Sequence, residues 1–399
     1  MNVYEDQRRV PSFLILTRKC AIIALMKVLV FDKQAKTAAD GMATYSKIII
    51  NNLIKKGHQV TVLRFGDKLG PADPPNTILL PYSLGDKAFY FLPTLQTEKI
   101  VRQTFAEFKP DIAHINFSVS LLDFSLPQIA HDYKVPVIGT MHQGFSESNQ
   151  LSLGNVGVKS YFLSHLACLK QLDKLLVFSS TVKNFFVSNG LLSKKIEVMP
   201  NCVDCQKYAP GKSQFKQKNH IDFAYLFLGR ISRQKNPDIL LETFANIKPP
   251  SNQKLIVVGS GDYGIMYQNL RRKYQHHPQI IFTGVISDLN QKIDVIRAAD
   301  VFVLPSSWEG MAFALLEAMA CGLAPIVTDA GSHKEVVGKT GIVIENNLIK
   351  EQLPIAMQLF AKFPEIAKPL GNQARQKVVR EFDQEIFIKK LISLYQEAV

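Results

Sequence analysis

The most informative side chains in the sequence are two glutamates eight positions apart, Glu309 and Glu317. Glu309 lies in a short loop after the apolar run 300–304, and Glu317 lies inside a segment whose pattern predicts a helix from about Met311. Free amides in the first turn of a helix attract anions such as a diphosphate. Because carboxylates accept hydrogen bonds from paired hydroxyls, one glutamate suits a sugar and the other a ribose, on opposite sides of that phosphate.

A bound diphosphate also needs cations, and two basic residues follow the apolar run 223–228. Arg230 and Lys235 are predicted to lie at the carboxyl edge of a parallel sheet. Arginine can bind phosphate oxygens through two parallel hydrogen bonds, whereas lysine acts as a point charge. One lysine alone would be read as a solvated surface charge, but the pair favours a phosphate site.

The stretch GSGDYG places Gly259, Gly261 and Gly264 in G-x-G-x-x-G spacing after the apolar run 254–258. This spacing is typical of NAD-binding proteins, which also need an acidic residue about 20 positions later, at the end of the next strand. Here the next predicted strand, 279–284, ends in Thr-Gly, and the motif follows the second strand of its half rather than the first. We therefore expect a tight turn that brings Gly259 and Gly261 close to a nucleotide other than NAD.

Short apolar runs alternate with amphipathic segments throughout the chain, which predicts parallel sheets covered by helices on both faces. In the first half, the strand candidates are 27–32, 59–65, 111–116, 135–140, 174–179 and 195–199, and the helix candidates are 41–56, 98–108, 121–132, 157–171 and 180–189. In the second half, the strand candidates are 223–228, 254–258, 279–283, 300–304, 324–328 and 341–344, and the helix candidates are 236–247, 262–275, 288–298, 311–321 and 348–362. The polar stretch 201–222 reads as a linker. Because ligands bind outside the carboxyl ends of such strands, both halves should direct their loops toward one cleft.

These patterns define a first domain, 26–203, and a second domain, 204–383. Residues 1–25 resemble a secretory signal superficially, but Arg18 and Lys19 divide the apolar stretch and no small-residue cleavage site follows. The first credible strand begins after Met26, so either Met26 is the true start or 1–25 is a poorly packed extension. The sequence contains no run of about 18 apolar residues, which a membrane-spanning helix would need.

The net charge of +13 is spread over both halves. Without an arginine-rich run or an aromatic-basic repeat, it argues against a nucleic-acid partner. It suits anionic substrates or contact with an anionic membrane, and a merely basic surface explains it equally well. The five scattered cysteines favour a reducing, cytoplasmic compartment. Cys202 and Cys205 form a C-x-x-C without the further ligands that a zinc site needs.

As a set, the motifs resemble the retaining nucleotide-sugar glycosyltransferases of family 4, which have the GT-B fold of two Rossmann-like domains facing a cleft. The match runs from about 27 to 345. The second half contributes G-R-x4-K, G-S-G-D, F-T-G and E-G-x6-E-A-M-A-C-G, and the first half contributes DGMATYSKIIINNLIKKGHQVTVL, KPDIAHIN, VPVIGTMHQGF, DKLLVFSS and VMPNCVD.

The resemblance implies a role for each anchor. Arg230 and Lys235 would bind the donor diphosphate, and Glu317 would hold the ribose hydroxyls. Glu309 would hold the transferred sugar. The backbone amides that would hold the sugar and phosphate with it are those of Ala312, Phe313 and Ala314.

In the first half, His142 would point at the sugar, and Gly41 and Met42 would form a loop beneath the diphosphate. The helix 384–399 would pack back on the first domain. The chain departs from the family pattern at four positions, none of which is a charged anchor: Met42, Asn116 in place of a histidine, Cys202 in place of a glycine, and Ala312 where glycine is frequent.

The resemblance implies transfer of a sugar from an NDP-sugar to a hydroxyl of a glycan or a lipid-linked acceptor, with retention and without metal or another cofactor. Such an enzyme would be cytoplasmic, and peripheral association with the inner face of the membrane is compatible with it. A GT-B nucleotide-sugar epimerase and a non-catalytic sugar-nucleotide-binding protein are the alternatives. An NAD dehydrogenase is disfavoured by the missing ribose carboxylate.

Overall fold

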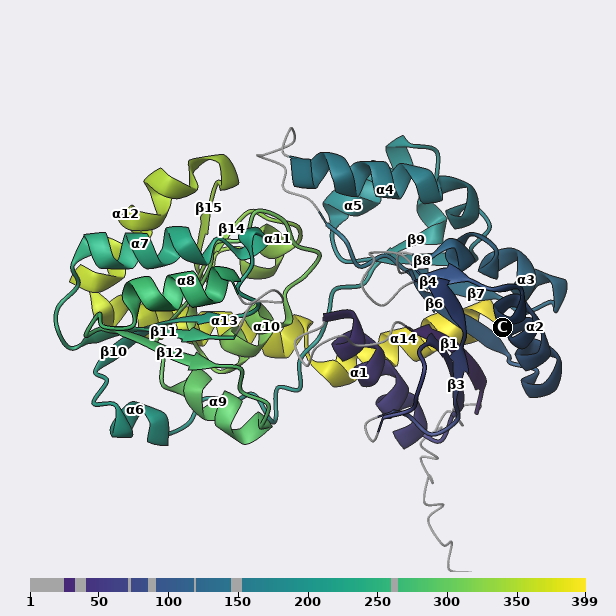
Figure 1. Ribbon diagram of the computed structural model, residues 1–399, viewed down its shortest axis with the longest axis horizontal. Helices are drawn as coiled ribbons and strands as arrows, with labels where there is room; N and C mark the ends of the chain where they lie inside the picture. The colour runs from purple at the N-terminus through teal and green to yellow at the C-terminus, as the bar shows by residue number, and fades with distance from the viewer. Residues whose placement is uncertain are drawn as a thin grey trace, which may run out of the picture.

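The computed structural model describes residues 25–32, 41–70, 73–84, 91–117, 120–144, 153–259 and 265–399. Over these residues the chain forms two α/β domains that lie side by side (Figure 1). Residues 1–24 lie outside the described residues, so the structure does not test the predicted extension or the two candidate start positions.

The first domain is built on a parallel sheet with the strand order β3-β2-β1-β6-β7-β8-β9. Its strands are β1 Lys27–Asp32, β2 Gln59–Phe65, β3 Thr77–Leu80, β6 Ile112–Asn116, β7 Val137–Thr140, β8 Lys174–Val177 and β9 Ile196–Val198; β4 Tyr82–Leu84 and β5 Leu92–Pro93 form a separate pair. Its helices are α1 Gly41–Lys55, α2 Leu95–Phe108, α3 Leu126–Asp132, α4 Leu153–Leu169 and α5 Ser180–Ser188.

The second domain has a parallel sheet with the order β12-β11-β10-β13-β14-β15. Its strands are β10 Phe223–Leu228, β11 Gln253–Val258, β12 Ile280–Gly284, β13 Val301–Leu304, β14 Ala324–Thr328 and β15 Ile342–Ile344. The remaining helices of the chain are α6 Gln214–Lys218, α7 Pro237–Ile247, α8 Ile265–Tyr274, α9 Leu289–Arg297, α10 Phe313–Ala320, α11 His333–Val337, α12 Ile349–Lys362, α13 Ala367–Glu381 and α14 Gln384–Ala398.

Both sheets are covered on two faces, which is why their central strands are continuous apolar runs rather than alternating ones. The side chains of Val28, Leu29 and Val30 in β1 are fully buried, as are those of Val301, Phe302 and Val303 in β13. The strand order reverses direction between β1 and β6 and again between β10 and β13. Loops at the carboxyl ends of strands around such a reversal form the ligand site of doubly wound sheets.

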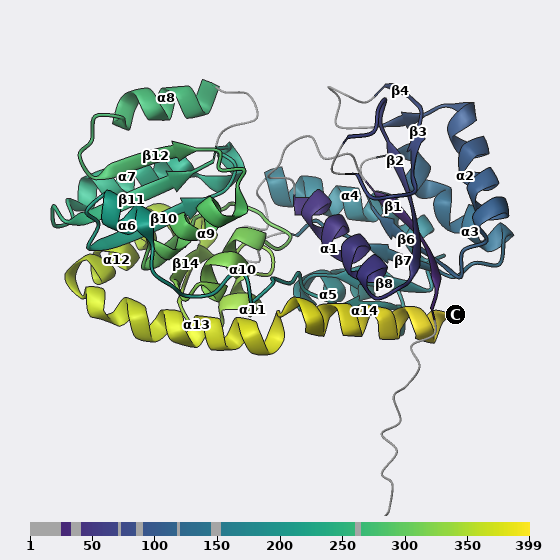
Figure 2. The same ribbon diagram turned by 90° about the horizontal axis from the view of Figure 1, so that it is seen from below.

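The chain crosses between the domains twice, and the two crossings are hydrogen-bonded to each other. The amide of Val203 donates to the Phe382 carbonyl at 2.9 Å, and the amide of Gln384 donates to the Val203 carbonyl at 3.0 Å. Figure 2 shows the result: α13 runs beneath the second domain and α14 continues beneath the first.

Helix α14 contributes to the core of the first domain. Its Tyr395 is fully buried, and the phenol oxygen lies 2.5 Å from His114 Nδ1 in β6. The second ring nitrogen of His114 lies 2.9 Å from the Thr140 hydroxyl. Burial lowers the pKa of His114 to about 3, so this imidazole stays neutral at physiological pH.

Several predicted boundaries need correction. Helix α10 begins at Phe313 rather than near Met311, because Ala312 has the extended backbone of an N-cap residue. The predicted linker 201–222 contains the short helix α6. The sequence patterns also missed β3, α11 and α13, whose apolar positions are too few or too interrupted to show a period.

Candidate active site

Helix α10 begins without a side-chain cap. Ala312 has no side chain that could cap the helix, and it makes no side-chain cap hydrogen bond. The start of α1 faces this turn from the other domain, since a Cβ placed on Gly41 would lie 3.9 Å from Phe313 Cδ2. Gly41 and Met42 form the first turn of α1, rather than the loop expected from the sequence.

The predicted cation and carboxylate form an ion pair beside that helix start. Lys235 Nζ donates to Glu309 Oε1, and both side chains are about one-tenth exposed. Burial raises the pKa of the Glu309 carboxyl, but the opposing effects of Lys235 and, less strongly, His333 hold it below its ordinary value. Glu309 is therefore ionised, and an incoming phosphate would compete with it for Lys235.

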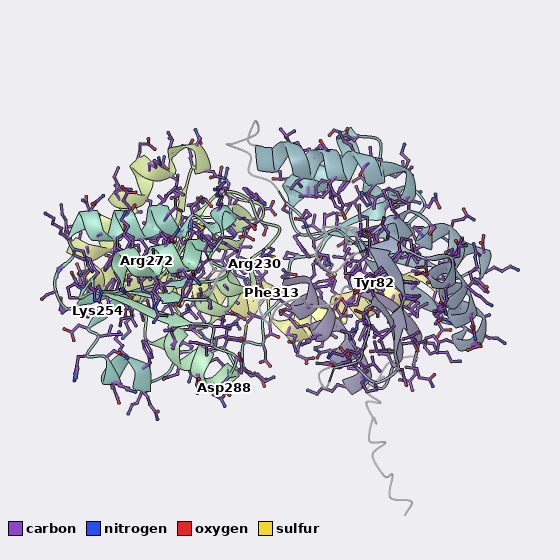
Figure 3. All side chains as sticks on the ribbon, in the orientation of Figure 1. Tyr82, Arg230, Lys254, Arg272, Asp288 and Phe313 are labelled. Carbon is purple, nitrogen blue, oxygen red and sulfur yellow. The ribbon has the colours of Figure 1, made fainter. Side chains whose placement is uncertain are left out.

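Arg230 and the glycine turns lie at the adjacent strand ends. A Cβ placed on Gly259, whose φ is +128°, would lie 1.9 Å from the Gly229 carbonyl oxygen, so only glycine fits there. Figure 3 labels half-buried Arg230 and Phe313, both on the side of the second domain that faces the first. Gly261 lies outside the described residues, and its predicted contact with the nucleotide is untested.

Glu317 is buried in α10 and is held by two donors that the sequence patterns did not reveal. Its Oε1 accepts from Lys292 Nζ at 2.6 Å and from the Tyr208 hydroxyl at 2.9 Å. Burial and the neighbouring Glu317 raise the pKa of Tyr208, so the phenol keeps its proton and donates. Lys292 comes from α9, and Tyr208 from the chain just after the first crossing. Hydrophobic periodicity does not indicate that either residue contacts Glu317.

His142 follows β7 and packs against two aromatic rings that also contact each other. The ring centroids of Tyr45 and Phe178 are 4.9 Å and 5.4 Å from that of His142, and both contacts are edge-on. His142 Nε2 lies 3.2 Å from Asn116 Oδ1. Three neighbours from different elements therefore hold the ring.

The backbone around His142 touches the loop that carries Glu309. A Cβ placed on Gly310 would lie 1.9 Å from the His142 carbonyl oxygen, and one placed on Gly144 would lie 2.2 Å from the Glu309 carbonyl oxygen. Ser332 holds the same loop from behind by donating to the Gly310 carbonyl through its amide and its hydroxyl, at 3.2 and 3.0 Å. The two domains thus meet where the predicted site residues of each converge.

The described residues include no group of three or more His, Cys, Asp or Glu side chains that could hold a metal ion. The thiols of Cys202 and Cys205 are buried in the core, and burial raises the pKa of Cys205 to about 12. In the described part of the chain, no helix is long and apolar enough to cross a membrane.

Two family models match the chain. The model for Glycosyltransferase Family 4 matches residues 39–207, and the model for Glycosyl transferases group 1 matches residues 211–377. The chain belongs to the group 1 glycosyltransferases. In this GT-B family, each model covers one of the two domains described above.

Among curated relatives, an Escherichia coli protein named UDP-Gal:alpha-D-GlcNAc-diphosphoundecaprenol alpha-1,3-galactosyltransferase is 29% identical over 59% of this chain and 61% of its own length. The Bacillus anthracis N-acetyl-alpha-D-glucosaminyl L-malate synthase is 26% identical over 52% of this chain and 55% of its own. The chain thus matches about three-fifths of the first relative and slightly more than half of the second.

Solved structures show the same fold. Sucrose-phosphate synthase from Thermosynechococcus elongatus superposes with a TM-score of 0.73 at 20% identity, covering 93% of this chain and 98% of its own. Anabaena HepE in complex with UDP-glucose superposes with a TM-score of 0.73 at 16% identity, covering 94% of this chain and all of its own. The predicted GT-B architecture of two Rossmann-like domains is therefore confirmed.

Proposed function

We propose that this protein transfers a sugar from a nucleoside diphosphate sugar to a hydroxyl of a glycan or lipid-linked acceptor, with retention of the anomeric configuration. The observation that carries the proposal is the buried Lys235–Glu309 pair beside the uncapped start of α10. A cation, free helix amides and a carboxylate are then adjacent, as a sugar diphosphate requires.

In this proposal, the donor diphosphate displaces Glu309 from Lys235. Lys235, Arg230 and the α10 amides would bind its oxygens, and Glu309 would then accept hydrogen bonds from the sugar. As the bond between the anomeric carbon and the phosphate oxygen breaks, negative charge grows on the diphosphate. These preorganised donors would stabilise that charge without a metal ion.

Retention follows in this proposal from attack on the face that the diphosphate leaves. The acceptor oxygen bonds to the anomeric carbon, and the acceptor proton passes to the departing phosphate oxygen. Closure of the two domains over the donor would exclude water, which would otherwise take the place of the acceptor. Glu317 would hold the ribose hydroxyls while Lys292 and Tyr208 fix its orientation.

A lipid-linked acceptor at a membrane surface is the form of the proposal that we favour. The name of the Escherichia coli relative specifies a diphosphoundecaprenol acceptor. In this chain, the surplus of positive charge would attract an anionic membrane, and Val156 and Leu163 on α4 are 47% and 46% exposed. Packing against a lipid surface would cover these two side chains.

The decisive experiment begins with thermal unfolding in the presence of UDP-, GDP- and ADP-sugars. The donor that stabilises the protein is then incubated with a polyprenyl diphosphate sugar, and the configuration of the product is read by NMR. An epimerase would convert the donor without an acceptor, and a non-catalytic binding protein would release no nucleotide. Either result would overturn the proposal.

Lys235→Ala tests the residue that carries the proposal. We expect transfer to fall by about 10²- to 10³-fold, the scale of losing one preorganised donor to the transition state. Lys254→Ala is the matched control, because Lys254 lies near the start of β11, far from Arg230 in Figure 3, and donates to the Pro278 carbonyl at 2.9 Å. Near-normal transfer by Lys235→Ala would contradict the assignment.

A further inference from the structure

A chain of hydrogen bonds links His142 to the end of β1. Its members are Asp32 at the end of β1, Ser46 in α1, Asn116 at the end of β6 and His142 after β7. The Ser46 hydroxyl donates to Asp32 Oδ1 at 2.5 Å, Asn116 Nδ2 donates to Ser46 Oγ at 3.0 Å, and Asn116 Oδ1 lies 3.2 Å from His142 Nε2. Ser46 and Asn116 are buried.

The chemistry of these groups fixes the direction of each bond. The carboxylate of Asp32 can only accept, so the Ser46 hydroxyl gives it its hydrogen and accepts from the Asn116 amide nitrogen. The amide oxygen of Asn116 is then the atom that faces His142, and it can only accept. His142 must therefore carry a hydrogen on Nε2, and in the neutral ring Nδ1 is the acceptor.

We propose that Asn116, anchored by Ser46 and Asp32, is a positioning residue that fixes the tautomer and ring orientation of His142 for contact with the transferred sugar. This inference rests on the proposed function for the role of His142, but its tautomer prediction does not. The edge-on rings of Tyr45 and Phe178 restrict how far the imidazole can tilt. The amide oxygen of Asn116 lies at Nε2 and so favours the tautomer with hydrogen on that nitrogen.

The first test reads the hydrogen directly. Nitrogen-15 NMR of the imidazole groups in the full-length protein, with His142 assigned by comparison with His142→Gln, should show hydrogen on Nε2 in the neutral ring. In Asn116→Ala the signal should shift toward a mixture of the two tautomers. Hydrogen on Nδ1 in the unaltered protein, or an unchanged tautomer in Asn116→Ala, would overturn the proposal.

The second test uses transfer rates. We expect Asn116→Ala to lower kcat at least about tenfold, because a histidine in the wrong tautomer cannot offer the right atom. The double variant with His142→Ala should be no slower than His142→Ala alone, since the two residues act as a unit. Additive losses would mean that Asn116 acts independently of His142.

Asn52→Ala is the matched control for folding. Asn52 is also a buried asparagine of the first domain, and its amide donates to the Ile48 carbonyl within α1. If Asn116→Ala does not fold, Ser46→Ala replaces it, because loss of the hydroxyl frees the Asn116 amide to rotate. If the unaltered protein has the expected tautomer but transfers no sugar to any acceptor, the proposed function fails while the positioning role of Asn116 stands.

Discussion

Lys235 is already paired with a carboxylate in the described structure, and this pairing decides how the site responds to pH. Glu309 is ionised although it is buried, because Lys235 and His333 outweigh the cost of burial. A group whose folded pKa is lower than its unfolded pKa stabilises the fold above the unfolded pKa. That contribution is lost as the pH falls through the folded value.

Glu309→Gln should therefore lower stability in a pH-dependent way. At pH 7 we expect a loss of about 3 kcal/mol, since the variant leaves a buried ammonium without its counter-charge. The difference in free energy of unfolding between the variant and the unaltered protein should shrink as the pH falls below about 4.5, the ordinary pKa of glutamate. Thermal unfolding between pH 7 and pH 3.5 measures it.

Glu98→Gln is the control for that experiment. Glu98 pairs with Arg102 on the surface of α2, and its side chain is 52% exposed, so its loss should change stability by less than about 1 kcal/mol at every pH. A stability gap for Glu309→Gln that stays constant down to pH 3.5 would show that the carboxylate is not the stabilising group.

Residue type and spacing predicted that Lys235 and Glu309 follow strands of the same sheet, and the structure pairs them. Their roles in binding a diphosphate and a sugar stay predictions. Residue type and spacing were not enough to predict the partners. Lys292 and Tyr208 reach Glu317 from 25 and 109 positions away, through the packing of α9 and of the first crossing. Asn116 was identified only as a departure from the family pattern, and its contact with His142 came from the fold.

Among the elements, the start of α10 combines a stability cost with the binding role that we propose for it. Ala312 has the backbone of an N-cap residue but cannot act as one, so the helix gives up the stabilisation that a serine would supply. The same absence keeps the first-turn amides available for a diphosphate. Helix α10 is therefore less stable than it would be with a capping side chain at position 312.

Ala312→Ser should reverse this balance. The hydroxyl would accept from a first-turn amide, and we expect the free protein to gain about 0.5–1 kcal/mol of stability. Donor binding should weaken because that amide is occupied. Thermal unfolding with and without the donor measures both effects, and a variant that becomes more stable and binds the donor more tightly would contradict the role given to these amides.

Elements were predictable where an apolar run ends abruptly at polar residues. The predicted runs 59–65 and 223–228 coincide with β2 and β10, whose residues are almost all buried. The strand β3 was missed because its apolar run of three residues is too short to identify a strand, and α11 because five residues are too short to show a helical period.

In the whole molecule, at least one contact between the domains is exposed, so that water can replace it. Glu335 in α11 accepts from the Ser180 amide at 2.9 Å, so a carboxylate of the second domain binds the first turn of α5 in the first. The contact is exposed, and its loss leaves no buried group unsatisfied. Such a contact biases the domains toward the described arrangement without locking them.

Glu335→Ala should shift the free protein toward a more open arrangement. We expect a larger radius of gyration by small-angle X-ray scattering without donor, and the value of the unaltered protein at saturating donor. The control is Glu365→Ala, an exposed glutamate of the same domain in the turn before α13. An unchanged radius without donor would show that Glu335 does not favour closure.

The position of α14 also matters while the protein is being made. The first domain is not a continuous piece of sequence, because Tyr395 completes a buried contact with His114, which lies 281 positions earlier. When the first 203 residues have left the ribosome, the apolar surface of the first domain that α14 will cover is therefore still exposed. That surface stays prone to aggregation until residues 384–398 emerge and cover it.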